Sequence, residues 1–494
     1  MARVVVVGAG MGGLAAAARL AAQRRDVTVC EQAPVVGGKV GTYSRDGFTF
    51  DTGPSLLTLP AVYRDLFLKT GRPLEDVVEI CPVDPAFRYR FADGTWLDVP
   101  NAAPGRTVRA MDEALGPGSG AQWASLMARA GEMWQLTRRP FLESPLSRRE
   151  LARLALRPGN IRTVGPLTTL RDLGRRYLAD PRLRMMLDRY ATYTGSDPRR
   201  APAALAVIPY VEQAFGAWYV RGGMRRLAEA VADRAREAGA AVRTGADVVR
   251  IETDGHRVTG VRLRDGEVLP ADVVVANADA TQVYDELLGR MPRRPRAPRP
   301  RDASLSGFVL LLALDGRTPD LAHHTVLFPD QEPYDAEFDA VFGSTRTRPR
   351  PAPDPTIYIS APDDPALRPD DGCEAWFVLV NAARHGDVDW DEPGRADAYA
   401  DHVLAVMARR GLDVRHRVRW RVVRTPADLQ RETRAPGGAI YGTSSNGPRS
   451  AFLRPANTSP VPGLFLVGGS THPGGGLPLV GLGAAIVADA VGRA

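Results

Sequence analysis

A glycine-rich turn between an apolar strand and a helix of small residues most constrains how this chain can fold. Residues 3–14 read Arg-Val-Val-Val-Val-Gly-Ala-Gly-Met-Gly-Gly-Leu, so four valines run into a Gly-x-Gly-x-x-Gly turn. The first glycine of such a turn permits the tight bend, the second lets a pyrophosphate approach the backbone, and the third lets the helix pack on the strand. The helix N-terminus then faces the phosphates. The contacts predicted here are Gly8, Gly10, Met11, Gly12 and Gly13.

A second strand that ends in an acid completes a βαβ unit. Residues 27–31 read Val-Thr-Val-Cys-Glu, and Glu31 lies eighteen residues after Gly13. An acid at this place accepts hydrogen bonds from the hydroxyls of an adenosine ribose. Strand, turn, helix, strand and acid therefore occur in the order of a dinucleotide-binding α/β domain. We expect Glu31 and the adjacent Gln32 to contact the dinucleotide.

The residues after this acid indicate which dinucleotide is bound. The chain continues with Val36-Gly37-Gly38-Lys39, and Lys39 is one of only two lysines among 64 Lys and Arg residues. A glycine pair with a cation can wrap backbone and charge around the pyrophosphate of a permanently held cofactor. Together with Phe50-Asp51-Thr52-Gly53-Pro54-Ser55, this segment resembles the FAD-binding N-terminus of the glutathione-reductase-like flavoprotein superfamily. The resemblance implies cofactor contacts from Gly38, Lys39, Gly53, Pro54 and Ser55.

The C-terminal end supplies a third part of the same site. The apolar strand at residues 462–467 runs into Gly468-Gly469, and Thr471-His472-Pro473-Gly474-Gly475-Gly476-Leu477-Pro478 leads into a helix over residues 479–491. Backbone N–H groups at such a helix start can lie against a flavin and direct a dipole at its N1–C2 edge. The contacts predicted here are Gly469, Gly475, Gly476, Pro478, Leu479 and Val480.

These motifs narrow the resemblance to the phytoene desaturase family of bacterial carotenoid enzymes. The central segment Pro209–Met224 is similar to a signature of that family, so the match spans most of the chain. The resemblance implies a Rossmann-like FAD-binding domain with an inserted mixed α+β substrate domain. It also implies that the backbone of Val248 contacts the adenine. Because no residue that could form a covalent bond lies in a recognised tethering sequence, we expect FAD to be bound non-covalently.

The order of sequence patterns divides the chain into five segments. We expect residues 1–85, 215–290 and 445–494 in the FAD-binding domain, and residues 86–214 and 291–444 in the substrate domain. The patterns predict helices over 121–136, 167–178 and 224–238, strands over 241–251, 258–263, 273–276 and 304–314, and long Pro/Asp loops around 315–372.

The absence of other redox motifs from the sequence defines the expected chemistry. The sequence holds no second Gly-x-Gly-x-x-Gly, and its three cysteines are too widely spaced for a disulfide framework or a metal site. The flavin must therefore exchange electrons directly with the substrate, which the resemblance implies is an apolar isoprenoid, and then with oxygen or a quinone. A carbon next to a polyene is too weak an acid for a side-chain base to begin the reaction. We expect hydride transfer to flavin N5, followed by loss of a proton.

His472 and Glu212 are the candidates for the proton step. His472 lies inside the C-terminal flavin loop, where its ring could instead cap the loop and pack on Pro473. Glu212 could face the substrate or form a salt bridge to a nearby arginine. The aromatic residues Tyr210, Phe215, Trp218 and Tyr219 either line a tunnel for the isoprenoid chain or belong to the core.

Two other functions fit the same motifs. One is a different flavoenzyme, either an amine oxidase or a carotenoid isomerase or saturase. Flavin amine oxidases usually carry a lysine near the flavin, whereas Lys39 is assigned to the pyrophosphate and Lys69 lies far along the first domain. The other is a non-catalytic prenyl-lipid carrier of the Rab-escort type. Intact glycines at both ends of the chain speak against a carrier that needs no flavin.

The basic composition suggests an anionic surface rather than nucleic acid. The formal net charge is +7, but the densest arginine cluster, residues 290–301, is so rich in proline that we interpret it as a surface linker. Residues 147–157 combine a capping box with Leu151 and Leu154 between arginines. Such a helix either rests on anionic lipid headgroups or packs its leucines into the core. Because no run of about eighteen apolar residues occurs, we expect a cytoplasmic protein at the inner face of the membrane.

Overall fold

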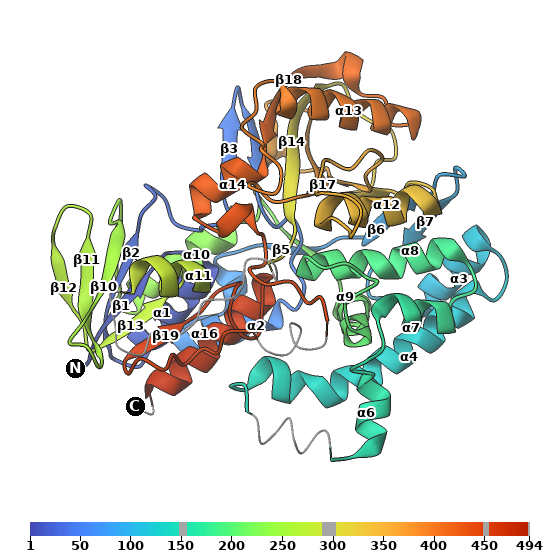
Figure 1. Cartoon of the computed structure of the whole chain (residues 1–494). Coiled ribbons are helices and arrows are strands. Elements are labelled where there is room, and N and C mark those ends of the chain that lie inside the picture. The colour runs from blue at the N-terminus through green and yellow to red at the C-terminus, as the bar shows by residue number, and fades with distance from the viewer. Residues whose placement is uncertain (148–155, 289–302, 448–453, 493–494) are drawn as a thin grey trace.

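The four valines of the first strand lie at the centre of a parallel sheet in the computed structural model (Figure 1), which describes residues 1–147, 156–288, 303–447 and 454–492. Val4 pairs with Val27 on one side and with Val273 on the other. The first βαβ unit therefore forms as the sequence predicts. The strands of this five-stranded sheet are, in spatial order, β19 (Leu464–Leu466), β13 (Val273–Ala276), β1 (Arg3–Val7), β2 (Asp26–Glu31) and β9 (Ala241–Thr244).

Each face of this sheet is covered by a different layer. Val4 and Val6 point into a core with three helices, while Val5 and Val7 point into a core with a second, three-stranded sheet. Successive side chains of β1 therefore lie on opposite faces of the sheet, and both faces are buried. The helices are α1 (Met11–Ala22), α10 (Arg225–Glu237) and α16 (Leu477–Gly492). The other layer consists of β10 (Val248–Thr253), β11 (Val258–Leu263), β12 (Val268–Pro270), α11 (Ala280–Gln282) and η5 (Val283–Leu287).

A seven-stranded mixed sheet forms the second half of the molecule. Its long strand β14 pairs with β17 along ten residues, and α13 (Arg395–Arg409) packs over one face. Strands from two distant segments of the chain meet in it, because β15 pairs with β6. The strands are, in order, β18 (Val418–Arg424), β14 (Ser306–Asp315), β17 (Cys373–Ala382), β16 (Ile357–Ser360), β15 (His324–Leu327), β6 (Phe87–Arg90) and β7 (Trp96–Val99).

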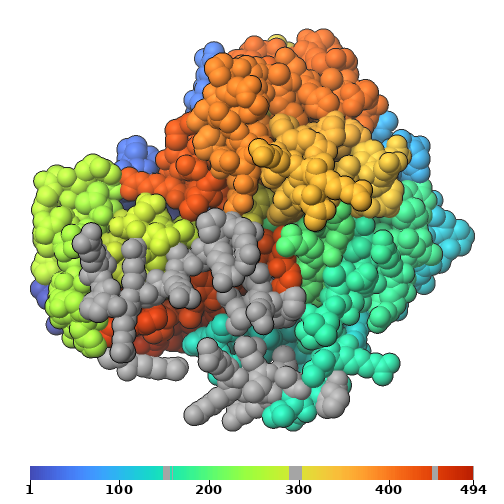
Figure 2. All heavy atoms as spheres, in the orientation of Figure 1, coloured from blue at the N-terminus to red at the C-terminus, as the bar shows by residue number. Residues whose placement is uncertain are grey.

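A group of helices packs against β6, β7 and β15 and shares a core with them. In Figure 2 the green and blue-green segments with most of these helices lie on the right, the orange segment with α13 and β18 at the top, and β10–β12 on the left. No helix in the described part of the chain combines the length and apolar character needed to cross a bilayer. The helices of this group are α3 (Pro104–Leu115), α4 (Ser119–Arg138), η2 (Arg139–Glu143), α6 (Pro158–Val164), α7 (Leu170–Tyr177), α8 (Pro181–Arg189), η3 (Tyr190–Thr194), η4 (Ala203–Ala206), α9 (Val207–Phe215) and α12 (Gln331–Phe342).

Smaller elements connect the two halves of the molecule. They are the hairpin of β3 (Thr42–Arg45) and β4 (Phe48–Asp51), the pair of β5 (Ile80–Pro82) and β8 (Trp218–Val220), and the helices α2 (Ala61–Thr70) and α14 (Pro426–Thr433).

Two expectations about secondary structure are wrong. The predicted strand 241–251 is two strands, because Gly245 takes a positive φ of 69° and the chain leaves one sheet to begin another. The segment 315–372 is not only loops, since β15, α12 and β16 lie within it. Its prolines and aspartates flank these short elements. The linker at 290–301 and the leucines Leu151 and Leu154 fall outside the described residues.

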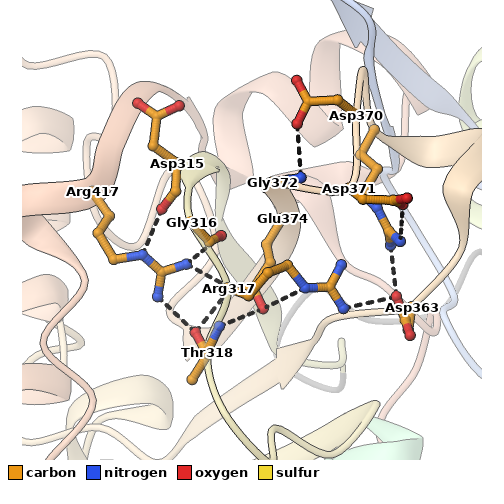
Figure 3. A network of polar contacts seen from close by, with 11 residues as sticks. Asp315, Gly316, Arg317, Thr318, Asp363, Asp370, Asp371, Gly372, Glu374 and Arg417 are labelled. Carbon is orange, nitrogen blue, oxygen red and sulfur yellow. Dashed lines mark hydrogen bonds and ion pairs between the residues drawn. The ribbon is translucent and has the colours of Figure 1, made fainter.

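A buried acid joins the ends of the strands in the second sheet. Glu374 on β17 accepts hydrogen bonds from the backbone N–H and the hydroxyl of Thr318, both at 2.8 Å, and from Arg417 at 2.9 Å (Figure 3). Its exposed fraction is 8%. Arg417 also donates to the carbonyl groups of Asp315 and Gly316. This network therefore fixes the turn after β14 against β17 and β18.

Replacing Glu374 with alanine is expected to lower the free energy of unfolding by about 3 kcal/mol, because Arg417 and Thr318 lose a shared buried partner. Urea unfolding followed by circular dichroism measures this change. Asp363 is a matched control from the same figure, since its side chain is 72% exposed and its ion pairs are screened by water. Asp363→Ala should change stability by less than about 1 kcal/mol. Equal losses for the two variants would contradict the role of Glu374.

Candidate functional site

One cavity of ≈ 700 Å³ runs between the five-stranded sheet and the seven-stranded sheet. Of the residues predicted to bind the cofactor, only Gly13 does not line it. A Cβ at Gly13 would lie 2.2 Å from the carbonyl oxygen of Gly8, so this glycine lets α1 pack against the turn. The predicted contacts that line the cavity are Gly8, Gly10, Met11, Gly12, Glu31, Gln32, Gly38, Lys39, Gly53, Pro54, Ser55, Val248, Gly469, Gly475, Gly476, Pro478, Leu479 and Val480.

Asn277, directly after β13, supports the glycine turn and was not predicted. Its side-chain amide donates to the carbonyl of Gly8 at 3.3 Å. A Cβ at Gly10 would lie 2.7 Å from the Asn277 amide nitrogen. A side chain at position 10 would therefore clash with Asn277 as well as with a ligand at the turn. The N-terminus of α1 has no side-chain cap and no acidic residue in its first turn, so its dipole favours an anion in the cavity.

Glu31 is held by two backbone N–H groups at the end of β2. One carboxylate oxygen accepts from Ala9 at 2.6 Å and the other from Ala33 at 2.9 Å. The residue is 6% exposed. Each carboxylate oxygen has a second lone pair, so both can still accept a hydrogen bond from a ligand in the cavity. This geometry fits the pair of hydroxyls on a ribose.

Lys39 lies in the cavity wall, but its ammonium group reaches across to the other half of the molecule. It donates to the carbonyl groups of Ala439 at 3.1 Å and Ile440 at 2.7 Å. Burial lowers the pKa of Lys39 to about 8. Two of its hydrogen bonds thus go to backbone carbonyl groups, whereas the sequence motif predicted that this ammonium group binds a pyrophosphate.

The C-terminal glycine loop lies against a second buried cation. Arg454 donates to the carbonyl groups of Tyr441 at 2.8 Å and Gly469 at 3.2 Å. Burial lowers the pKa of Arg454 to about 10. A Cβ at Gly475 would meet the ring of Tyr441 at 2.7 Å, whereas one at Gly476 would meet nothing within 4 Å. The loop is therefore packed on one side and open toward the cavity on the other.

His472 lines the cavity and forms a hydrogen bond to the segment after η2. Its Nε2 lies 2.9 Å from the carbonyl oxygen of Ser144, so Nε2 carries the proton and donates. Burial lowers the pKa of His472. The ring is therefore neutral, with a free lone pair on Nδ1. The backbone carbonyl of His472 accepts from Asn457 at 2.7 Å, which holds the loop without use of the ring.

Glu212 is buried in the cavity wall between two tyrosines. It accepts from the hydroxyl of Tyr190 at 2.5 Å and from that of Tyr193 at 3.4 Å. Burial raises the pKa of Glu212 to about 7. The alternative of an arginine salt bridge is wrong for the described residues, because tyrosine hydroxyls take the positions where a guanidinium would bind.

The predicted aromatic tunnel is also wrong. None of Tyr210, Phe215, Trp218 and Tyr219 lines the cavity. Tyr210 packs near Gly131 on α4, and Tyr219 donates to Asp364 at 2.9 Å. The helix α9 presents Val207, Ile208, Val211 and Glu212 to the cavity, so Tyr210 faces away from it. Phe215 is 42% exposed, and Trp218 and Tyr219 belong to β8. The aromatic residues that do line it are Phe87, Trp134, Phe141, Tyr193, Tyr358, Phe377 and Tyr441.

Comparison with known proteins identifies the family. A model of the flavin containing amine oxidoreductases matches residues 11–491. The chain belongs to this family. It is 35% identical to the 4,4'-diapolycopene oxygenase of Methylomonas sp over 99% of this chain and 98% of that protein. It is also 35% identical to the zeta-carotene-forming phytoene desaturase of Myxococcus xanthus, over 99% and 93%. A hydroxyneurosporene desaturase of Rubrivivax gelatinosus is 34% identical over 99% and 92%.

Solved structures support the same fold. Putrescine oxidase bound to putrescine has a TM-score of 0.66 at 16% identity, with 100% of this chain and 99% of that chain covered. Cyclohexylamine oxidase from Brevibacterium oxydans has a TM-score of 0.61 at 16% identity, with both chains fully covered. The chain therefore has an FAD-binding α/β fold, and its cofactor is FAD. The uncapped start of α1, the free lone pairs of Glu31 and the open space at Gly476 fit the phosphates, the ribose and the flavin.

Replacing Glu31 with glutamine is expected to reduce the FAD bound per polypeptide at least tenfold. The amide NH₂ of glutamine would oppose a backbone N–H of Ala9 or Ala33, which leaves a buried donor without an acceptor. Acid precipitation followed by the flavin absorbance of the supernatant measures the content, and it also tests whether FAD is free of a covalent bond. Glu267→Gln, at an exposed position in the turn between β11 and β12 that does not line the cavity, should retain the wild-type content. Full FAD in Glu31→Gln would remove this acid from the cofactor site.

Proposed function

We propose that the protein is an FAD-dependent desaturase of a long apolar isoprenoid or polyene, such as phytoene or a related carotenoid. The observation that carries this proposal is the continuity of one cavity from the glycine turns to apolar walls. Those walls are formed by α9, by the sheet residues Val309, Phe377 and Leu379, and by Phe141 and Leu142 of η2. The relatives named as phytoene and hydroxyneurosporene desaturases support the same substrate class.

The residues of the cavity suit hydride removal followed by proton loss. FAD, when bound, accepts a hydride, and oxygen or a quinone then takes the electrons. The apolar walls orient the chain and exclude water from it. Glu212 supplies a carboxylate that ionises near neutral pH and lies in the wall of the cavity, so it can hold the proton that leaves the substrate. His472 offers a second acceptor at its Nδ1.

Other reactions on the same fold are less well supported. The relatives at 34% and 35% identity are named as carotenoid enzymes, whereas the amine oxidases share the fold at 16% identity, which disfavours an amine oxidase. A lipid carrier needs no FAD, whereas the family is flavin-containing. An isomerase or saturase would leave the number of conjugated double bonds unchanged or lower it.

The direct test supplies the FAD-loaded protein with phytoene in liposomes under air and again with a quinone under nitrogen. Desaturation lengthens the conjugated system, so absorption bands at longer wavelength are the expected result. Products with unchanged or shorter conjugation would favour the isomerase or saturase. Turnover of putrescine without turnover of phytoene would favour the amine oxidase.

Replacing Glu212 with glutamine is expected to slow product formation by about 10²-fold, because a positioned base is lost. In the wild type the rate should fall as the pH drops below about 7, since the raised pKa of Glu212 leaves the carboxyl group protonated there. This limb of the pH profile should be absent from Glu212→Gln. The absorbance of the conjugated product between pH 5.5 and 8.5 measures both effects.

Glu432→Gln is the matched control for this test. Glu432 also lines the cavity but is paired with Arg424 at the surface, so its variant should keep the wild-type pH profile. An unchanged acidic limb in Glu212→Gln would assign the proton step to another group, with His472 as the next to examine.

We also propose that the protein binds the surface of a membrane on the cytoplasmic side through the segment around α6. Leu156, Ile161 and Leu167 are 78%, 45% and 89% exposed, and the exposed Arg157 and Arg162 lie among them. Exposed apolar side chains beside arginines are typical of contact with anionic lipid. The cavity residues Phe141 and Leu142 belong to η2, which has no buried residue. An apolar substrate could thus enter near the lipid.

The double variant Ile161→Ser, Leu167→Ser is expected to bind anionic liposomes at least fivefold more weakly than the wild type, while its FAD content stays the same. Flotation of the protein with the vesicles measures binding. Val268→Ser is the matched control, because Val268 is 44% exposed on β12, remote from this segment. Equal flotation of the double variant and the wild type would refute this surface as the lipid contact.

A further inference from the structure

Arg189, the last residue of α8, is a buried cation that lines the cavity and forms no ion pair with a carboxylate in the described part of the chain. Its exposed fraction is 7%. Among the described residues its guanidinium makes one hydrogen bond, a long one of 3.5 Å from Nη1 to the hydroxyl of Tyr89. Its other N–H groups have no partner within that part of the chain.

Two other arginines in the same region, the buried Arg171 and the partly exposed Arg199, are paired with acids. Arg171 donates to Asp188 and Asp335, and Arg199 donates to Asp197 and Asp339. Pairing is the usual condition for a guanidinium removed from water, because an unpaired buried charge is costly. Arg189 departs from the pattern of its neighbours and directs unused donors into a cavity.

Aromatic rings hold Arg189 in place and leave its donors free. The carbon at the centre of the guanidinium lies 4.7 Å from the ring centroid of Phe87, 5.1 Å from Tyr193, 5.7 Å from Tyr358 and 5.9 Å from Tyr89. Ring faces stabilise a cation, but they accept few of its hydrogen bonds. Tyr193 also donates to Glu212, so one side chain contacts both the acid and the cation.

An unpaired cation here conflicts with a substrate that is only hydrocarbon. Such a chain would fill the cavity and remove the water that solvates the guanidinium. Loss of a hydride also leaves positive charge on the chain, and a nearby cation in a medium of low polarity repels it. Both conflicts are relieved if the chain carries an oxygen atom that accepts hydrogen bonds from Arg189, because charge-assisted bonds are strong.

We propose that Arg189 binds a hydroxyl or carbonyl oxygen on the end group of the polyene, so that the enzyme prefers oxygenated chains to the corresponding hydrocarbons. This inference rests on the proposed desaturase function and specifies its substrate class. Arg189 would be a binding residue for the end group, whereas Glu212 serves the proton step.

The kinetic test compares three chains of equal length and equal number of C=C double bonds: a hydrocarbon, its tertiary alcohol and its terminal aldehyde. The wild type should show a kcat/KM about ten- to a hundredfold higher for the oxygenated chain that fits, since one charge-assisted hydrogen bond is gained. In Arg189→Met this ratio should fall to near one. Comparison of the alcohol with the aldehyde shows whether Arg189 binds a hydroxyl or a carbonyl oxygen.

Arg184→Met is the matched control. Arg184 lies on the same helix but donates to the carbonyl groups of Leu178 and Ala179 and does not line the cavity. It should keep the wild-type ratio. Arg189→Lys retains a charge and a donor, so it should restore part of the preference if the methionine variant folds poorly.

A binding measurement gives a readout that does not depend on turnover. A guanidinium that donates to an aldehyde conjugated with the polyene polarises it, so the absorption band should move to longer wavelength when the aldehyde binds. The hydrocarbon should show no such shift. The shift should be absent from Arg189→Met and present in Arg184→Met.

The outcomes separate this inference from the proposed function. Equal turnover of hydrocarbon and oxygenated chains by the wild type would overturn the inference and leave the desaturase function in place. An Arg189-dependent band shift without desaturation of any chain would support the inference and overturn the function. A loss of FAD affinity specific to Arg189→Met would show that the cation contacts the cofactor instead, which also overturns the inference.

Discussion

The close approach of α1 to the turn after β1 is the constraint on which the rest of this structure depends. No Cβ fits at Gly13, where the carbonyl of Gly8 occupies that space, and Asn277 fills the space beside Gly8 and Gly10. This contact brings three distant segments of the chain together, because β13 and β19 follow β1 in the same sheet. The uncapped N-terminus of α1 and the carboxylate of Glu31 then face one cavity. A dinucleotide site thus follows from backbone packing before any ligand is considered.

The second half of the molecule completes this cavity with few side chains that carry charge. Lys39 and Arg454 donate to backbone carbonyls of residues 439–441, so they join the two halves near the flavin loop. Glu212 is surrounded by hydroxyls and Arg189 by aromatic rings. Burial raises the pKa of Glu212 toward neutral pH and leaves the guanidinium of Arg189 short of hydrogen-bond acceptors. A ligand that interacts with such a group gains the most binding free energy.

The sequence allowed the cofactor half to be predicted well. Glycine spacing, the acid after β2 and the glycine loop before α16 reflect local backbone geometry, and local geometry is encoded within a few residues. The sequence left open whether the aromatic run from Tyr210 to Tyr219 lines a tunnel or belongs to the core, since the face that α9 turns to the cavity depends on how it packs against α4. The prediction of a single strand over 241–251 is wrong because β9 and β10 follow each other closely in the sequence but belong to different sheets.

What the sequence by itself determined is the FAD-binding fold and most of the residues that line the cavity at the glycine turns. Gly8, Gly10 and Gly13 act through backbone shape, and Glu31 follows them at a fixed spacing. What only the tertiary structure decided is the substrate side. Nothing distinguishes Arg189 from the other arginines in the sequence; its role depends on Phe87, Tyr193 and Tyr358, which come from separate elements. Long-range packing alone determines which buried charge finds a partner and which one is left for a ligand.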